Sequence, residues 1–89
     1  MAAALPVTIS TYTCTGNEQN HTFDADMKQA WLCAKDTNVD IGNVSGTREF
    51  PIMSGTTIFV QNKNWAGRTL YFSGTLDKIF AILEDTAIS

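Results

Sequence analysis

The sequence predicts an all-β domain, either a small antiparallel β-sandwich or a partly closed barrel of roughly six to eight short strands. Short runs rich in β-branched and aromatic residues recur about every 8 to 12 residues, separated by turns rich in Gly, Asn, Asp and Ser. No helical run lies between these segments, which argues against a βαβ fold. The 89 residues suffice for one domain, so we expect an N-terminal arm over residues 1–6 and a single β domain over residues 7–89.

The first half of the chain contains two strong strand signals. Residues 7–13 alternate apolar Val7 and Ile9 with polar residues, which is typical of a strand with one face toward a core. A polar turn follows over residues 14–20, then a short strand over residues 21–23 and a single helical turn over residues 24–29. Residues 30–35 are apolar on both faces, which favours a central strand with Trp31 and Cys33 in the core.

The second half predicts the remaining strands. Val39 and Ile41 indicate a short strand, and residues 50–52 lead into a turn over residues 53–55. Further strands are expected over residues 56–61, 68–73 and 79–84, with a loop over residues 62–67 that carries Trp65. The last of these runs also fits a helix capped by Asp77, but its position directly after a turn that follows a strand favours a strand.

The strands of the second half carry more apolar side chains than a sandwich needs, because each strand requires only one apolar face. Ile58, Val60, Leu70 and Leu83 suffice for a core, which leaves a second set for an outward patch of the kind that marks interfaces, unless the sheet curls and loops cover that face. Trp65, in a polar loop, is an interface anchor, a sugar-stacking platform or a cap on the end of the sandwich. The candidate interface residues are Trp65, Phe59, Tyr71, Phe80, Ile82 and, in an arm over residues 2–7 that is able to add a strand to a neighbour, Val7.

Composition argues against several function classes. The formal net charge is −3 and the six Lys and Arg are scattered, so no nucleic-acid partner is expected. No run reaches the roughly 18 apolar residues of a membrane span, and residues 1–5 lack the basic start of a secretory signal, so we expect synthesis in a cytoplasm and no membrane partner.

Catalytic, cofactor and metal sites are not expected either. His21 is the single histidine, and its pairing with Cys14 or Cys33 is less favoured than a surface histidine beside two packed thiols. Asp24 and Asp26 are interpreted as a solvated turn rather than a Ca²⁺ site. A disulfide between the two cysteines is left open but not favoured.

The order of motifs over about residues 30–84 resembles small β-sandwich virion proteins of tailed bacteriophages. The residues that carry the resemblance are V-D-I-G-N at 39–43, F-P-I-x-x-G at 50–55, the strand T-T-I-F-V, a loop ending at Gly67, L-Y-F-S-G at 70–74 and the closing I-F-A-I-L. This resemblance implies a structural role in the virion, most of all as a head decoration or cement protein. Its partners are then capsid or other virion proteins, and it acts as a homo-oligomer, with a trimer favoured.

Two alternatives remain at the level of the sequence. The first is a tail, neck or fibre component of the virion. The second is a carbohydrate-binding β-sandwich module in which Trp65 and Tyr12 stack on sugars.

Overall fold

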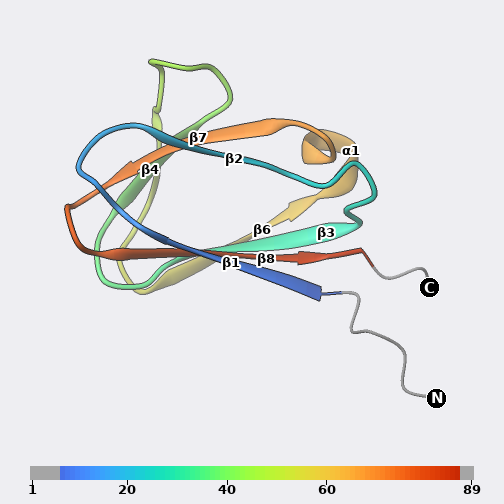
Figure 1. Cartoon of the computed structure of the whole chain (residues 1–89), viewed down its shortest axis with the longest axis horizontal. Helices are drawn as coiled ribbons and strands as arrows, with labels where there is room; N and C mark the ends of the chain where they lie inside the picture. Colours follow the sequence, from blue (N-terminus) through green and yellow to red (C-terminus); the bar gives the residue numbers. More distant parts are fainter. Residues whose placement is uncertain (1–6, 87–89) are drawn as a thin grey trace.

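Eight strands form two antiparallel sheets of four strands each in the computed structural model, which describes residues 7–86 (Figure 1). One sheet has the order β1-β8-β3-β6 and the other the order β2-β7-β4-β5. The elements are β1 (Val7–Thr13), β2 (Gln19–Thr22), β3 (Gln29–Ala34), β4 (Val39–Gly42), β5 (Phe50–Ile52), β6 (Thr56–Gln61), the single helical turn α1 (Asn62–Trp65), β7 (Thr69–Gly74) and β8 (Ile79–Asp85). This is the strand order of a jelly roll, a sandwich of two Greek keys.

The predicted fold class is confirmed, and the sheets form a sandwich rather than a closed barrel. The strands expected over residues 7–13 and 56–61 have the same bounds in the structure, and residues 79–85 form a strand, not a helix. Two local predictions are wrong. In place of a helical turn over residues 24–29, a tight turn is closed by the Met27 N–H, which donates to the Asp24 carbonyl at 3.1 Å, and Gln29 already belongs to β3. The expected loop after β6 begins with helix α1.

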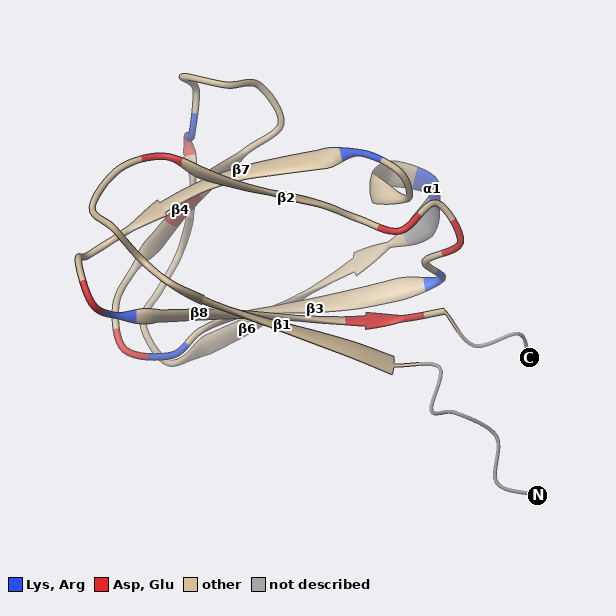
Figure 2. Cartoon of the chain, viewed as in Figure 1, with Lys and Arg blue, Asp and Glu red and all other residues tan. Residues whose placement is uncertain are grey.

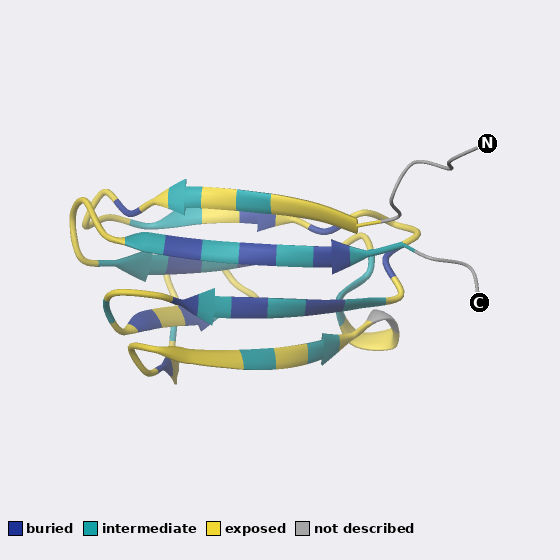
Figure 3. Ribbon diagram, turned by 90° about the horizontal axis from the view of Figure 1, so that it is seen from below, coloured by how far each residue is buried: buried dark blue, intermediate teal, exposed yellow. Residues whose placement is uncertain are grey.

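The core lies between the two sheets and is built from alternate residues of each strand. Ala30, Leu32 and Ala34 of β3 point inward, and buried and less buried residues alternate along both central strands of the β1-β8-β3-β6 sheet (Figure 3). The rings of Phe72 on β7 and Phe80 on β8 meet across the interior with centroids 4.7 Å apart. Aromatic contact of this kind adds to the free energy gained from area burial alone.

Inside and outside are exchanged for several residues of the β1-β8-β3-β6 sheet. Phe80 and Ile82 are completely buried, so the prediction that they face outward is wrong. Leu83, which was expected in the core, lies on the outward face with Trp31 and Cys33, and all three are only partly buried. Strand β8 is apolar on both faces, so its alternation does not tell which face is inside.

Both cysteines are free, and the open question of a disulfide is answered. Cys14 is buried at the end of β1, where it packs against Gly74 of β7. A Cβ added at Gly74 would lie 2.6 Å from the Cys14 Sγ atom, closer than real side chains approach. Glycine at position 74 therefore makes room for the Cys14 thiol between the sheets.

We expect Gly74→Ala to lower the free energy of unfolding by about 1–3 kcal/mol, because the added methyl group overpacks the Cys14 side chain. In a chain that also carries Cys14→Ala, the steric conflict with the sulfur is gone and part of the loss is recovered. Urea unfolding of the four proteins of this double-mutant cycle measures the coupling. If the losses of unfolding free energy in the two single variants simply add in the double variant, the proposed contact is contradicted.

Candidate functional site

A row of four apolar side chains crosses the outward face of the β1-β8-β3-β6 sheet. The pairing of β1 with β8 places Ile9 opposite Leu83, and β3 continues the same row with Trp31 opposite Leu83 and Phe59 of β6 opposite Trp31. The Trp31 and Phe59 rings lie with centroids 5.4 Å apart. Ile9 and Phe59, at the two edges of the sheet, are 64% and 48% exposed. We call these four residues the apolar row.

The surroundings of the apolar row are almost without charge. The neighbouring row consists of Thr11, Ala81, Cys33 and Thr57, in the same register. Among the outward residues of these four strands within residues 7–86, Asp85 alone is charged, and its carboxylate accepts a hydrogen bond from the Gln29 amide at 2.9 Å. The charged residues of the chain lie mostly in turns, with a cluster of acidic residues at the end of β8 (Figure 2). A partner can therefore cover this face while desolvating few ions.

The outward face of the other sheet is different in character. Its rows contain Asn20, Thr22, Thr69, Ser73 and Asp40, with Tyr71 opposite Asn20. The two outer faces of the sandwich are thus unequal, one polar and one with an apolar row.

A groove of about 390 Å³ opens between the two sheets on the side of β5 and β6. Its lining is largely apolar and includes Phe50, Ile41, Ile58, Val60 and Trp65, and it reaches Phe59 at the edge of the apolar row. Trp65 of α1 packs edge-to-face against the buried Phe23, with ring centroids 5.8 Å apart. This is the capping role that was one of three possibilities for Trp65, with part of the ring left to line the groove.

The predicted interface residues do not form one patch. Phe59 and Val7 are exposed on the outward face of the β1-β8-β3-β6 sheet, while Tyr71 lies on the outward face of the opposite sheet. Phe80 and Ile82 are in the core and cannot contact a partner. The sequence interpretation missed Ile9, Leu83 and Trp31 as parts of a shared surface, because only the strand order brings them beside Phe59.

A buried hydrogen-bonded network joins the two sheets near the opposite side. The Tyr12 hydroxyl lies 2.6 Å from Nδ1 of His21, and Nε2 of His21 lies 2.8 Å from Oε2 of Glu84. The other Glu84 oxygen accepts the Asp24 backbone N–H at 2.8 Å. An ionised carboxylate only accepts, so Nε2 of His21 carries the hydrogen. The network links β1 and β8 of one sheet to β2 of the other.

This network corrects two interpretations of the sequence. His21 is buried rather than on the surface, and its partners are Tyr12 and Glu84, not a cysteine. Tyr12 points between the sheets, where its ring packs on Phe72 at 5.1 Å, so it is not a sugar-stacking platform. Burial raises the pKa of the Tyr12 hydroxyl above its ordinary value, and the Glu84 carboxylate raises it further.

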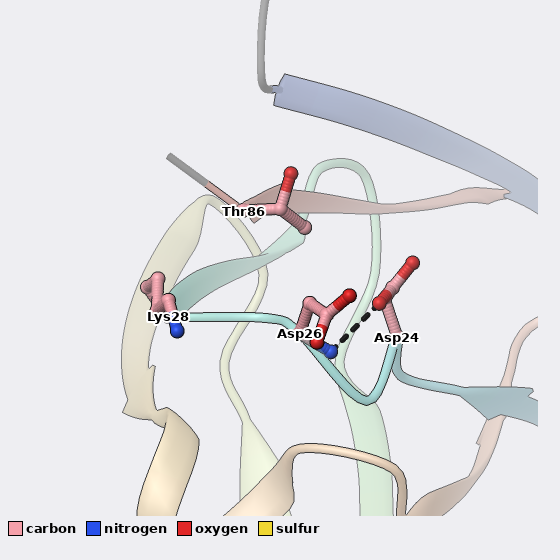
Figure 4. Close-up of a pocket in the computed structure, with 4 residues that line it drawn as sticks. All are labelled: Asp24, Asp26, Lys28 and Thr86. Carbon is pink, nitrogen blue, oxygen red and sulfur yellow. Dashed lines mark hydrogen bonds between the residues drawn. The ribbon is translucent and has the colours of Figure 1, made fainter. Parts of the chain in front are cut away.

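A shallow polar pocket lies beside the network, lined by Asp24, Asp26, Lys28 and Thr86 (Figure 4). The Asp24 Oδ1 atom accepts the Asp26 backbone N–H at 2.7 Å, so this carboxylate shapes its own turn. Within residues 7–86, no group of three or more His, Cys, Asp or Glu side chains is arranged to hold a metal ion. No helix in the same range has the length and apolar character that crossing a bilayer requires.

Comparison with known proteins gives no match to a family model, to a curated protein or to a solved structure. The candidate site therefore rests on geometry alone, and its main elements are the apolar row and the adjoining groove.

Glu84→Ala should lower the free energy of unfolding by about 3–5 kcal/mol, because it leaves the buried His21 ring N–H without an acceptor and also removes the acceptor of the Asp24 backbone N–H. Asp85→Ala, at the next position of β8 but on the outward face, should cost only about 1 kcal/mol. Urea unfolding of both variants makes the comparison. Equal losses in the two variants would mean that the buried hydrogen bonds of Glu84 stabilise the fold no more than the exposed hydrogen bond of Asp85.

The raised pKa of the Tyr12 hydroxyl leads us to expect a loss of stability at alkaline pH. Because its pKa is higher in the folded state, its contribution is complete below the unfolded value of about 10 and is lost as the pH rises through the folded value. Tyr12→Phe should therefore reduce the fall in urea midpoint between about pH 8 and about pH 11. Tyr71→Phe, on the outward face, is the control for tyrosine removal. An unchanged pH dependence in Tyr12→Phe would contradict the assignment.

Proposed function

We propose that this chain is a structural protein of a bacteriophage virion, of the capsid-decoration type, which stabilises a protein shell by adhesion and performs no chemistry. The observation that carries the proposal is the apolar row of Ile9, Leu83, Trp31 and Phe59 across one outward sheet face. The resemblance of residues 30–84 to small virion proteins supplies the class of particle.

The apolar row is not needed to hold the sandwich together. The core is complete between the sheets with residues such as Leu32, Phe72 and Phe80, all fully buried. Ile9 and Phe59 are exposed at the two ends of the row, and Leu83 and Trp31 between them are partly exposed. Apolar side chains that reach the surface together mark areas that a partner covers. Covering a Phe or Ile side chain that is half exposed contributes on the order of 1 kcal/mol. The row therefore favours binding to another protein surface.

The size of this face indicates the kind of binding. Four strands spaced about 4.8 Å apart, each about 20 Å long, present roughly 400 Å². A standard interface buries about 800 Å² on each partner. One sheet face therefore supplies about half of a stable contact. This suits a protein that binds as a symmetric oligomer, with a trimer favoured, because each copy then adds its own contact. The partners in this proposal are capsid or other virion proteins.

The non-catalytic part of the proposal is supported by the histidine. Both ring nitrogens of His21 are already hydrogen-bonded within the protein, to Tyr12 and Glu84, and the ring is buried. A general base needs access to the proton that it removes. The jelly-roll strand order occurs in both viral capsid and lectin domains, so it is compatible with the proposal without selecting it.

The test uses particles of the phage that encodes this chain, prepared without it. Purified chain should cosediment with these particles to saturation, and the double variant Ile9→Thr/Phe59→Thr should bind at least about 10-fold more weakly, since roughly 1.4 kcal/mol corresponds to a factor of ten. Threonine keeps the β propensity of both positions. Val44→Thr, which alters a side chain 57% exposed outside the apolar row, should bind like the wild type.

Failure of the wild-type chain to bind these particles would overturn the proposal of decoration. Mass spectrometry of separated heads and tails then tests the tail, neck or fibre alternative, which predicts few copies that fractionate with tails. A change in tryptophan fluorescence with a glycan, abolished by Trp65→Ala, would instead identify a carbohydrate-binding module.

A further inference from the structure

The groove on the side of β5 and β6 has the form of a site for an extended peptide. It is open to solvent, it has a volume of about 390 Å³, and its lining residues carry no charge. Ile58 and Val60 of β6 form one wall, and Phe50, which is 59% exposed, stands on the opposite strand β5. An apolar groove beside a strand receives alternate side chains of an added strand.

The edge of β6 supplies the second half of such a site. Strand β6 is at the end of the order β1-β8-β3-β6, and it pairs with β3 on one side only among the described strands. Its residues, T-T-I-F-V-Q, include neither a charged residue nor a proline, the usual devices that protect an edge from pairing. The other edge facing the groove, β5, is protected by Pro51.

We propose that residues 1–6 of a second copy of this chain add to the β6 edge as a strand and place their apolar side chains in this groove. The segment reads M-A-A-A-L-P, so its side chains carry no charge, like the groove lining. Six extended residues span about 20 Å, which is the length of the six-residue strand β6. Pro6, which has no N–H to donate, stands at the end of the segment.

The register of the sheet explains why the arm comes from a second copy. Val7, Asp85, Gln29 and Gln61 form one row across the sheet, so the arm leaves β1 three strand spacings from the end of β6. Crossing about 14 Å uses roughly four extended residues and leaves about two of the six to pair with β6. A neighbouring molecule placed beside β6 loses none of its arm to this crossing. The exchange of arms also closes into a dimer or a ring.

This inference deepens the proposed function, because exchanged arms would build the oligomer that presents several apolar rows to a shell. It predicts that the full-length chain is a defined oligomer by light scattering. A chain without residues 2–6 and the variant Phe50→Asp, which puts a charge into the groove, should each be monomeric. Met53→Asp is the matched control, because Met53 is 56% exposed near the end of β5 but does not line the groove, and it should remain oligomeric.

Complementation provides the decisive measurement. The chain without residues 2–6 keeps its groove, and Phe50→Asp keeps its arm, so a mixture of the two monomers should form a one-to-one complex. Unchanged thermal unfolding of each variant shows that folding is intact. A monomeric full-length chain, an unchanged oligomer after removal of residues 2–6, or a mixture without complexes would each overturn the inference.

Phe59 lines both the apolar row and the groove, so the removal of residues 2–6 is the change that separates this inference from the shell-binding test. Shell binding that depends on Ile9 and Phe59, by a chain whose assembly ignores residues 2–6, overturns the arm exchange and supports the proposed function. Assembly that requires residues 2–6, by a chain that does not bind particles, supports the arm exchange and overturns the proposed function. Loss of shell binding in Phe50→Asp, with a monomeric wild type, would assign the groove to a strand of the shell protein and overturn the exchange between copies.

Discussion

The buried contact between Glu84 and His21 determines which face of β8 is the inside. Phe80, Ile82 and Glu84 alternate along one face of β8, and Ile79, Ala81 and Leu83 along the other. Both faces are apolar enough to form a core, so hydrophobic burial alone separates the two arrangements weakly. A shift of one residue would exchange them and move the Glu84 carboxylate to solvent, away from the His21 ring and the Asp24 N–H. The hydrogen bonds to Glu84 thus select the observed arrangement.

That selection explains why the sequence predicted the strands well and their faces poorly. The runs over residues 7–13 and 56–61 have dense β-branched residues and clear turn boundaries, so their strands were predicted with the observed bounds. On β8, by contrast, a carboxylate is normally expected outside. Placing Glu84 outside also places Phe80 and Ile82 outside, which is the prediction that the structure contradicts. The partner that permits the burial, His21, is 63 residues away in the sequence.

The candidate site could be predicted only in part, for a related reason. Phe59 was identified as a surplus apolar residue, and it is exposed. Its neighbours in the apolar row come from four strands, and the first and last strands of the chain lie side by side in one sheet. Local patterns in a sequence predict strands but not their order. Trp31 was assigned to the core because its segment is apolar on both faces, whereas β3 contributes only the small and branched side chains of Ala30, Leu32 and Ala34 to the core.

The two open sides of the sandwich differ in how far side chains close the gap between the sheets. On the side of β1 and β2, the Tyr12 hydroxyl bonds to His21 and the Tyr12 ring packs on Phe72, so side chains close the gap between the sheets. On the side of β5 and β6, the groove stays open and Trp65 fills only one part of it. Phe59 belongs to both the apolar row and the groove. A partner that covers only the flat sheet face leaves the groove open to solvent, and a partner that fills only the groove leaves the apolar row uncovered. The apolar row and the groove are therefore covered together only by a partner, or a pair of partners, that contacts both sides of the β6 edge.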